Sequence, residues 1–129
     1  MCYIKVMERI RNIEKETLEN NFFRKVLLTT KHQQLVVMSL NPSEDIGLET
    51  HENLDQFIKI EQGEGLAVLD GVETNFSSGF SVTIPSGTNH NIINTSSENP
   101  LKIYTIYSPP NHKDGTIHKT KQEAIENEE

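Results

Sequence analysis

A histidine that follows a tight turn between two strand-like segments is the residue best placed to do chemistry in this sequence. The stretch GFSVTIPSGTNHNIIN covers residues 79–94 and runs an apolar strand into a Pro-Ser-Gly turn before His90. Proline and glycine restrict the backbone of such a turn, so the turn sets the direction in which His90 leaves the next strand. A histidine in this place can sit in a core, cap a turn or hold a metal ion.

The spacing of the fixed residues in this stretch resembles the second signature motif of the cupin superfamily. The matching positions are Gly79, Pro85, Gly87, His90 and Asn94. Glycine adopts backbone conformations that other residues resist, and proline presets the corner of the turn. The resemblance implies a small single-domain cupin, which is an all-β double-stranded β-helix or jelly-roll barrel, and it makes His90 a candidate metal ligand.

An altered form of the first cupin motif lies upstream, in the stretch GLETHENLDQFIKIEQG, residues 47–63. The family pattern is His, one residue, His, three or four residues, Glu, six residues and Gly. Here Glu49 stands in place of the first histidine, His51 matches the second histidine, and Gln56 stands in place of the glutamate. A glycine closes the motif as expected, whereas the leading glycine of the family pattern falls on Ser43.

The resemblance therefore implies a metal site with two histidines, one carboxylate and a neutral amide. Two histidines with one carboxylate suit non-haem Fe(II), and Mn, Ni or Zn also accept these donors. Glu49, His51 and His90 are the candidate ligands of one divalent metal ion. Gln56 offers an amide oxygen, either as a distant ligand or as a partner of a metal-bound water. Without a metal, His90 would be a core histidine, Glu49 an exposed carboxylate and Gln56 a polar residue packed nearby.

The elements that must position these residues are short strands. Strand-like segments recur about every ten residues, with turn residues between them, which is typical of an all-β sandwich or barrel. We expect a barrel core over residues 22–108 in one domain that covers residues 1–129. Glu49 and His51 are two residues apart and so leave a strand on one face, and Gln56 shares a face with the isoleucines that alternate after it. The barrel must turn both faces inward.

Short helical segments are expected at the two ends of the chain. Residues 8–20 are polar with apolar residues at intervals that suit a surface helix. Near the other end, Thr120 and Glu123 have the spacing of a capping box, which predicts a helix within the C-terminal tail, residues 109–129.

Three further histidines lie outside the two motifs. His32 is expected at the surface in a hairpin turn, and residues 111–121 carry His112 and His118. This segment either folds over the barrel mouth and adds His118 to the pocket as a substrate-binding residue, or forms a surface turn and a solvated helix. The second alternative is simpler, and it is the one that we expect.

Composition narrows the function classes. The net charge of −7 and the scattered basic residues argue against nucleic acid as a partner. No run approaches the roughly 20 apolar residues of a membrane-spanning helix. Cys2 is the only cysteine, so no internal disulfide forms. The first residues lack the pattern of a signal peptide, and we expect a cytoplasmic location.

The sequence thus favours a metal-dependent enzyme that acts on a small organic substrate, of dioxygenase, sugar isomerase or lyase type. The alternative is a non-catalytic cupin that binds or senses a small molecule, and the substituted first motif favours it. Whether the protein is an enzyme, which metal it uses and which substrate it takes stay open, because one fold serves many functions. The resemblance also implies a homodimer.

Overall fold

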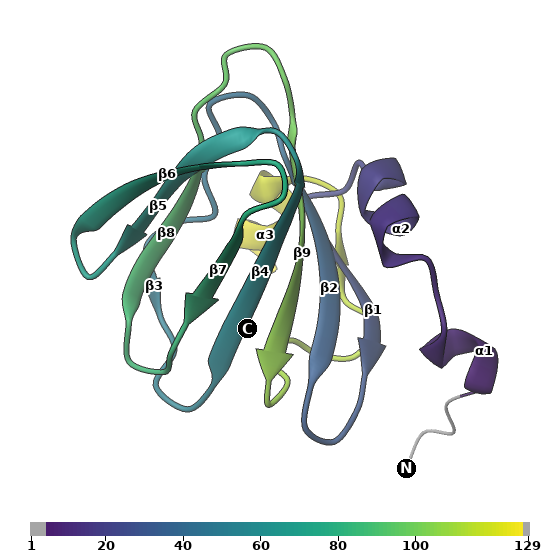
Figure 1. Ribbon diagram of the computed structural model, residues 1–129. Coiled ribbons are helices and arrows are strands. Elements are labelled where there is room, and N and C mark those ends of the chain that lie inside the picture. Colours follow the sequence, from purple (N-terminus) through teal and green to yellow (C-terminus); the bar gives the residue numbers. More distant parts are fainter. Residues whose placement is uncertain (1–4, 128–129) are drawn as a thin grey trace.

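The computed structural model describes residues 5–127, so Cys2 lies outside the described residues (Figure 1). This part of the chain folds into two antiparallel sheets flanked by short helices. The strands are β1 (Arg24–Thr29), β2 (Gln34–Leu40), β3 (Glu49–Thr50), β4 (Asp55–Gln62), β5 (Glu64–Leu69), β6 (Val72–Ser77), β7 (Ser81–Ile84), β8 (Asn89–Asn94), β9 (Leu101–Ser108) and β10 (Ile117–His118). The helices are α1 (Val6–Arg9), α2 (Ile13–Glu19) and α3 (Lys121–Glu126).

The two sheets enclose one apolar core. The larger sheet has the strand order β10-β1-β2-β9-β4-β7, and the smaller sheet has the order β3-β8-β5-β6. The buried cluster takes Ile58 and Ile103 from the larger sheet and Phe76 and Ile92 from the smaller one. Because strand side chains alternate between faces, every second residue of the central strands points into this space.

This alternation also brings polar residues inside. On β8 the buried positions are His90, Ile92 and Asn94, and on β4 they include Gln56 and Ile58. The faces predicted from the spacing of the sequence are therefore the faces that the fold buries. Two side chains with metal-binding atoms, His90 and Gln56, share the interior with the core.

The predicted strands are confirmed as a β-rich fold, and the helical ends differ from prediction in detail. The helix expected over residues 8–20 is split, because α1 ends before Asn12, whose side chain accepts a hydrogen bond from Lys15 N at 3.1 Å and caps α2. The capping box is confirmed, since Thr120 Oγ1 accepts from Glu123 N at 3.0 Å and α3 follows. Figure 1 shows α2 on the side of the larger sheet that faces away from the smaller one. None of the helices within residues 5–127 is long and apolar enough to cross a membrane.

Candidate metal centre and the pocket beside it

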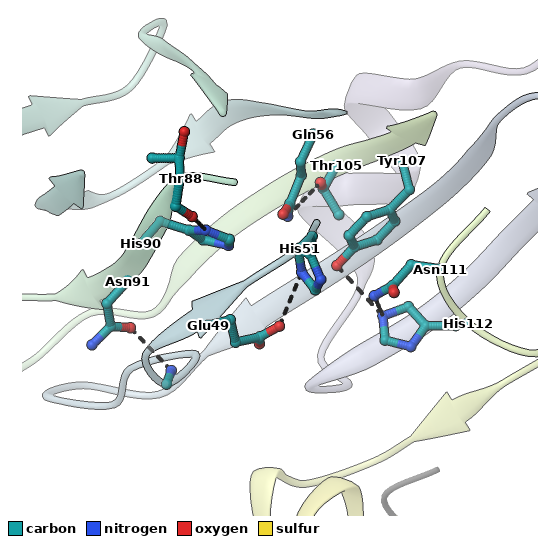
Figure 2. A network of polar contacts seen from close by, with 11 residues as sticks. Glu49, His51, Gln56, Thr88, His90, Asn91, Thr105, Tyr107, Asn111 and His112 are labelled. Atoms are coloured by element: carbon teal, nitrogen blue, oxygen red, sulfur yellow. Dashed lines mark hydrogen bonds and ion pairs between the residues drawn. The ribbon is translucent and has the colours of Figure 1, made fainter. Parts of the chain in front are cut away.

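Three candidate metal ligands meet at one end of the interior. Glu49 on β3 and His90 on β8 are direct partners across an antiparallel pair, so their side chains leave the sheet on the same face. His51 follows Glu49 by two residues and lies on that face as well (Figure 2). One ligand atom from each of the three side chains lies within 4.8 Å of the other two. The sequence motifs, which are about 30 residues apart, thus converge on one cluster.

The Pro-Ser-Gly turn joins the two motifs physically. The backbone N–H of Gly87 donates to the carbonyl of His51 at 2.7 Å, and the N–H of Ser86 donates to Asp55 Oδ1 at 2.9 Å. Gly87 has a φ of 83°, a left-handed conformation that favours glycine. The turn therefore does more than start β8, because it also holds the backbone of the second ligand.

The rings of the two histidines are oriented for ligation. His90 Nδ1 lies 2.9 Å from the carbonyl oxygen of Thr88 and donates to it, which leaves the lone pair on Nε2. Metal-binding histidines are commonly oriented by such a bond from the other ring nitrogen. His51 Nε2 is 3.0 Å from Glu49 Oε2. Two ligands at about 2.1 Å from one metal are separated by roughly 3.0–3.4 Å, so this spacing fits an ion.

Glu49 is held in its charged form. Burial disfavours the carboxylate, but the hydrogen bond from His51 and the positive charge of Arg24 outweigh burial, and the pKa of Glu49 lies below its usual value. An ionised carboxylate is the form that binds a divalent cation.

Gln56 presents an oxygen that no described group satisfies. Its amide nitrogen donates to Thr105 Oγ1 at 3.1 Å, which turns Oε1 away from Thr105, and Oε1 is buried without a hydrogen-bond partner among residues 5–127. Gln56 is the register partner of Tyr107, whose ring meets the ring of His51 edge-on at 6.0 Å between centroids. A buried acceptor without a donor is costly, so this oxygen fits an ion or an ion-bound water in the same space.

Tyr107 and His112 form a neutral polar pair next to the cluster. Their side chains approach at 3.4 Å between the phenol oxygen and His112 Nε2 (Figure 2). Burial raises the pKa of Tyr107 to about 12. Burial, reinforced by the charge of Arg24, lowers the pKa of His112 to about 4. Near neutral pH the tyrosine therefore keeps its proton, and the histidine can accept the hydrogen bond from it.

A pocket of about 460 Å³ opens beside the cluster on the Glu49 side. The C-terminal tail forms one wall of this pocket, because β10 pairs with β1 and places His118 opposite Arg24. Lys121 at the start of α3 is ion-paired with Asp45, which anchors the tail across the pocket. The pocket and the cluster therefore share one residue, Glu49.

The predicted site residues divide as follows. Glu49, His51 and His90 come together, and Gln56 lies in the interior beside Tyr107. The expectation of a surface turn and a solvated helix over residues 111–121 is wrong for His118, which is 8% exposed and lines the pocket, because β10 folds back onto β1. His32 is exposed in the turn between β1 and β2, as expected.

Two residues of the site were missed from the sequence. Arg24 is the first residue of β1 and shares its buried face with Val26, and a charged residue on an apolar face is the signal that could have marked it. Tyr107 occupies the same face of β9 as Ile103 and Thr105, so its inward direction follows from alternation. Neither signal says by itself what these residues contact.

Comparisons with known proteins agree with this architecture. The family model of the cupin domain matches residues 36–107. The chain is 47% identical over 120 residues to the YrkC protein of Bacillus subtilis (strain 168), an alignment that covers 88% of this chain and 64% of that protein. The chain thus spans less than two thirds of the length of this relative.

Two solved structures extend the comparison. The crystal structure of BH2720 from Bacillus halodurans matches with a TM-score of 0.89 and 42% identity, over 91% of this chain and 92% of that chain. The crystal structure of a predicted oxalate decarboxylase from Thermotoga maritima matches with a TM-score of 0.58 and 26% identity, over 62% of this chain and 69% of that chain.

Proposed function

The chain belongs to the cupin family, and from this premise we propose that it is a metal-binding small cupin that acts as a metal-dependent enzyme on a small organic substrate. We further infer that its two sheets close as the jelly-roll barrel of that family. The proposal of a metal rests on one observation above all. Glu49, His51 and His90 bring their ligand atoms within 4.8 Å of one another, with the carboxylate charged and the His90 ring oriented.

The residues of the site can divide the work of a reaction. Glu49, His51 and His90 would hold a divalent metal, with the amide oxygen of Gln56 as a further donor or as the partner of a bound water. A metal in this set would supply Lewis-acid chemistry or a place for O₂. Tyr107 holds a proton at its phenol oxygen and can donate a hydrogen bond to a developing negative charge.

The pocket supports a substrate of small-molecule size. Its volume of about 460 Å³ lies in the range of small-molecule sites. The predicted oxalate decarboxylase of Thermotoga maritima has the same fold, and decarboxylation of a small acid is one reaction that such a site can serve. Isomerase, lyase and dioxygenase chemistry also fit a metal next to such a pocket, so the reaction type is left open.

A non-catalytic binding or sensing cupin is the second candidate. The observation that favours it is Gln56, because a neutral amide occupies the position where the family pattern has a glutamate. The site keeps one carboxylate, Glu49, but has one histidine fewer than the family pattern, and such a change of the ligand set favours binding without chemistry. Tight binding of a ligand without turnover in metal-loaded protein would favour this candidate over the enzyme.

The test is the metal content of the untagged protein, purified without chelator and measured by plasma mass spectrometry. The wild type should carry about one equivalent of a single transition metal, and His51→Ala and His90→Ala should lose it. His32→Ala is the matched control, because His32 is exposed and remote from both motifs. Iron would direct the next assay to O₂ chemistry, and zinc or manganese would direct it to isomerase or lyase chemistry.

The proposal fails if the wild-type protein contains no metal and takes up none when Fe(II), Mn(II), Ni(II) or Zn(II) is added. It also fails if metal is bound equally by the wild type and both histidine variants. In either case His90 would be a structural histidine of the core.

A further inference from the structure

Arg24 is a buried cation that the fold leaves partly unpaired. Only 9% of its surface is exposed, and it lines the pocket beside Glu49. One terminal nitrogen donates to His118 Nδ1 at 3.3 Å. The Nε atom is buried without a hydrogen-bond partner among the described residues, and no carboxylate in that part of the chain forms an ion pair with the guanidinium. Burial of such a charge is costly, and a bound anion would offset that cost.

Lys102 shows how this fold treats a structural cation. Its ammonium group is buried as well, and it donates to the carbonyl of Asn20, to Asn21 Oδ1 and to Ser39 Oγ. Three oxygens thus surround Lys102, whereas Arg24 has one nitrogen acceptor, the ring of Phe23 at 5.2 Å from its guanidinium carbon, and an unpaired Nε. The difference indicates that Arg24 is not there to hold the fold together.

The charges around the pocket point to a group with a single negative charge. Lys121 is already neutralised by Asp45, and burial keeps His112 uncharged above a pKa of about 4. Glu49 contributes its negative charge to the metal cluster. Arg24 therefore remains as one positive charge without an ion-pair partner among the described residues, which matches a carboxylate better than a doubly charged phosphate. The planar guanidinium also fits the planar carboxylate.

We propose that this pocket is the substrate subsite of the metal centre, that Arg24 anchors a carboxylate of the substrate, and that the substrate class is therefore small organic acids. The inference rests on the proposed function, because it names the substrate class of the same site. The pocket also has an apolar wall, formed by Phe23, Ile46, Leu48 and Ile125, which suits a carbon skeleton attached to the carboxylate. His118 accepts from the guanidinium and so acts as a positioning residue for Arg24.

The experiment compares three ligands that share a phenyl ring by isothermal titration calorimetry, two with planar headgroups and one with a tetrahedral headgroup. Benzoate carries one charge, benzamide carries none, and phenylphosphonate carries up to two. In the wild-type protein benzoate should bind at least about 10-fold more tightly than benzamide, because a charged hydrogen bond replaces a neutral one. This comparison needs no variant, so it stands even if a substitution at Arg24 disturbs folding.

Variants then assign the effect to Arg24. Arg24→Gln should lower the affinity for benzoate by about 10-fold or more and leave that for benzamide nearly unchanged. Arg24→Lys should give an intermediate affinity, because it keeps the charge and loses the planar group. Lys25→Gln is the matched control, since Lys25 is the next residue of the same strand and does not line this pocket. Its affinity should equal that of the wild type.

The outcomes separate this inference from the proposed function when metal content is measured on the same samples. If metal is bound but benzoate shows no preference over benzamide, or if Arg24→Gln changes nothing, the carboxylate subsite is wrong and the metal centre stands. If Arg24 selects benzoate in protein that takes up no metal, the subsite stands and the metal centre is wrong. Phenylphosphonate binding at least about 10-fold more tightly than benzoate would overturn the assignment to carboxylates.

Discussion

The two ends of β8 carry buried polar residues with opposite surroundings. At one end, His90 makes one hydrogen bond to Thr88 and turns its other ring nitrogen toward the cluster with Glu49 and His51. At the other end, Asn94 donates to three backbone carbonyls at 2.9–3.1 Å and accepts from Ser96 N at 3.0 Å. Both residues are fixed positions of one motif, yet one has spare bonding capacity and the other has none.

The difference separates residues that hold the fold from residues that await a ligand. Two buried side-chain atoms within residues 5–127 lack a hydrogen-bond partner, Gln56 Oε1 and Arg24 Nε. Gln56 lies opposite Tyr107 beside the histidines, and Arg24 lines the pocket next to Glu49. Buried polar groups are nearly always satisfied, so two exceptions at one end of the molecule mark that end as functional.

The largest contrast is expected between Asn94→Ala and His90→Gln in the metal-free protein. Asn94→Ala should reduce the free energy of unfolding by roughly 3–5 kcal/mol, because it strands several buried backbone groups. His90→Gln keeps the volume and should cost less than about 1 kcal/mol. The measurement is urea unfolding followed by circular dichroism, since the chain has no tryptophan. Equal losses in the two variants would remove the distinction between the two ends.

The sequence predicts which residues form the metal cluster, but it does not predict how the pocket beside the cluster is built. Alternation and turn residues predict the strands. The motif spacing predicts that Glu49, His51 and His90 meet, because Glu49 and His90 face each other across a single strand pair, β3 and β8. The pairing of β1 with β10 joins residues 94 positions apart. No periodicity encodes such a long-range contact, so the burial of His118 and its bond with Arg24 could not be foreseen.

Ser43 departs from the residue type of the family motif but keeps the backbone conformation that the motif requires. The family pattern has a glycine at this position, and here Ser43 has a φ of 66°, in the left-handed region. The backbone demand that selects glycine is therefore present, and serine meets it with some strain. The sequence reveals the substitution, but the structure is needed to see that the conformation is kept.

Two buried glutamines sharpen the comparison. Gln34 uses its whole amide, because it donates to Thr29 Oγ1 and the carbonyl of His112 and accepts from the N–H groups of Asn111 and His112. Gln34→Leu should cost roughly 2–4 kcal/mol of unfolding free energy, whereas Gln56→Leu should stay within about 1 kcal/mol of the wild type. In metal-loaded protein, Gln56→Leu should weaken metal binding by about 10-fold. If Gln56→Leu is the more damaging of the two to unmetallated protein, Gln56 is structural.

Acid should lower the free energy of unfolding through the protonation of His112, which lies next to the metal cluster. Burial and the charge of Arg24 lower its pKa in the folded protein to about 4, while Glu49 opposes this shift and His118 and His51 add to it. The unfolded chain binds a proton near pH 6.5, so the unfolded state holds more protons between pH 6.5 and 4, and stability falls as the pH falls through that window. For this partly exposed ring the loss is about 2 kcal/mol.

Replacement of the ring tests this assignment. His112→Asn should flatten the fall in unfolding free energy between pH 7 and pH 4.5 by about that 2 kcal/mol, as measured by urea unfolding at each pH. His32→Asn is the control, because His32 is exposed and should leave the slope unchanged. An unchanged slope in His112→Asn would show that His112 takes up its proton in the folded protein as readily as in the unfolded chain.

The smallest expected effect compares two residues with positive φ at opposite ends of the fold. Ser43 donates its N–H to Ser96 at the Asn94 end, and Asp70 pairs with Asn89 beside His90. Ser43→Gly should raise the free energy of unfolding by about 0.5–1 kcal/mol, because glycine adopts this conformation without strain. Asp70→Gly relieves similar strain but loses the bond from Asn89 N to Asp70 Oδ1 at 2.9 Å, so it should gain nothing. A larger gain in the free energy of unfolding from Asp70→Gly than from Ser43→Gly would contradict this comparison. It would mean that the hydrogen bond from Asn89 to Asp70 contributes little to the stability of the turn beside His90.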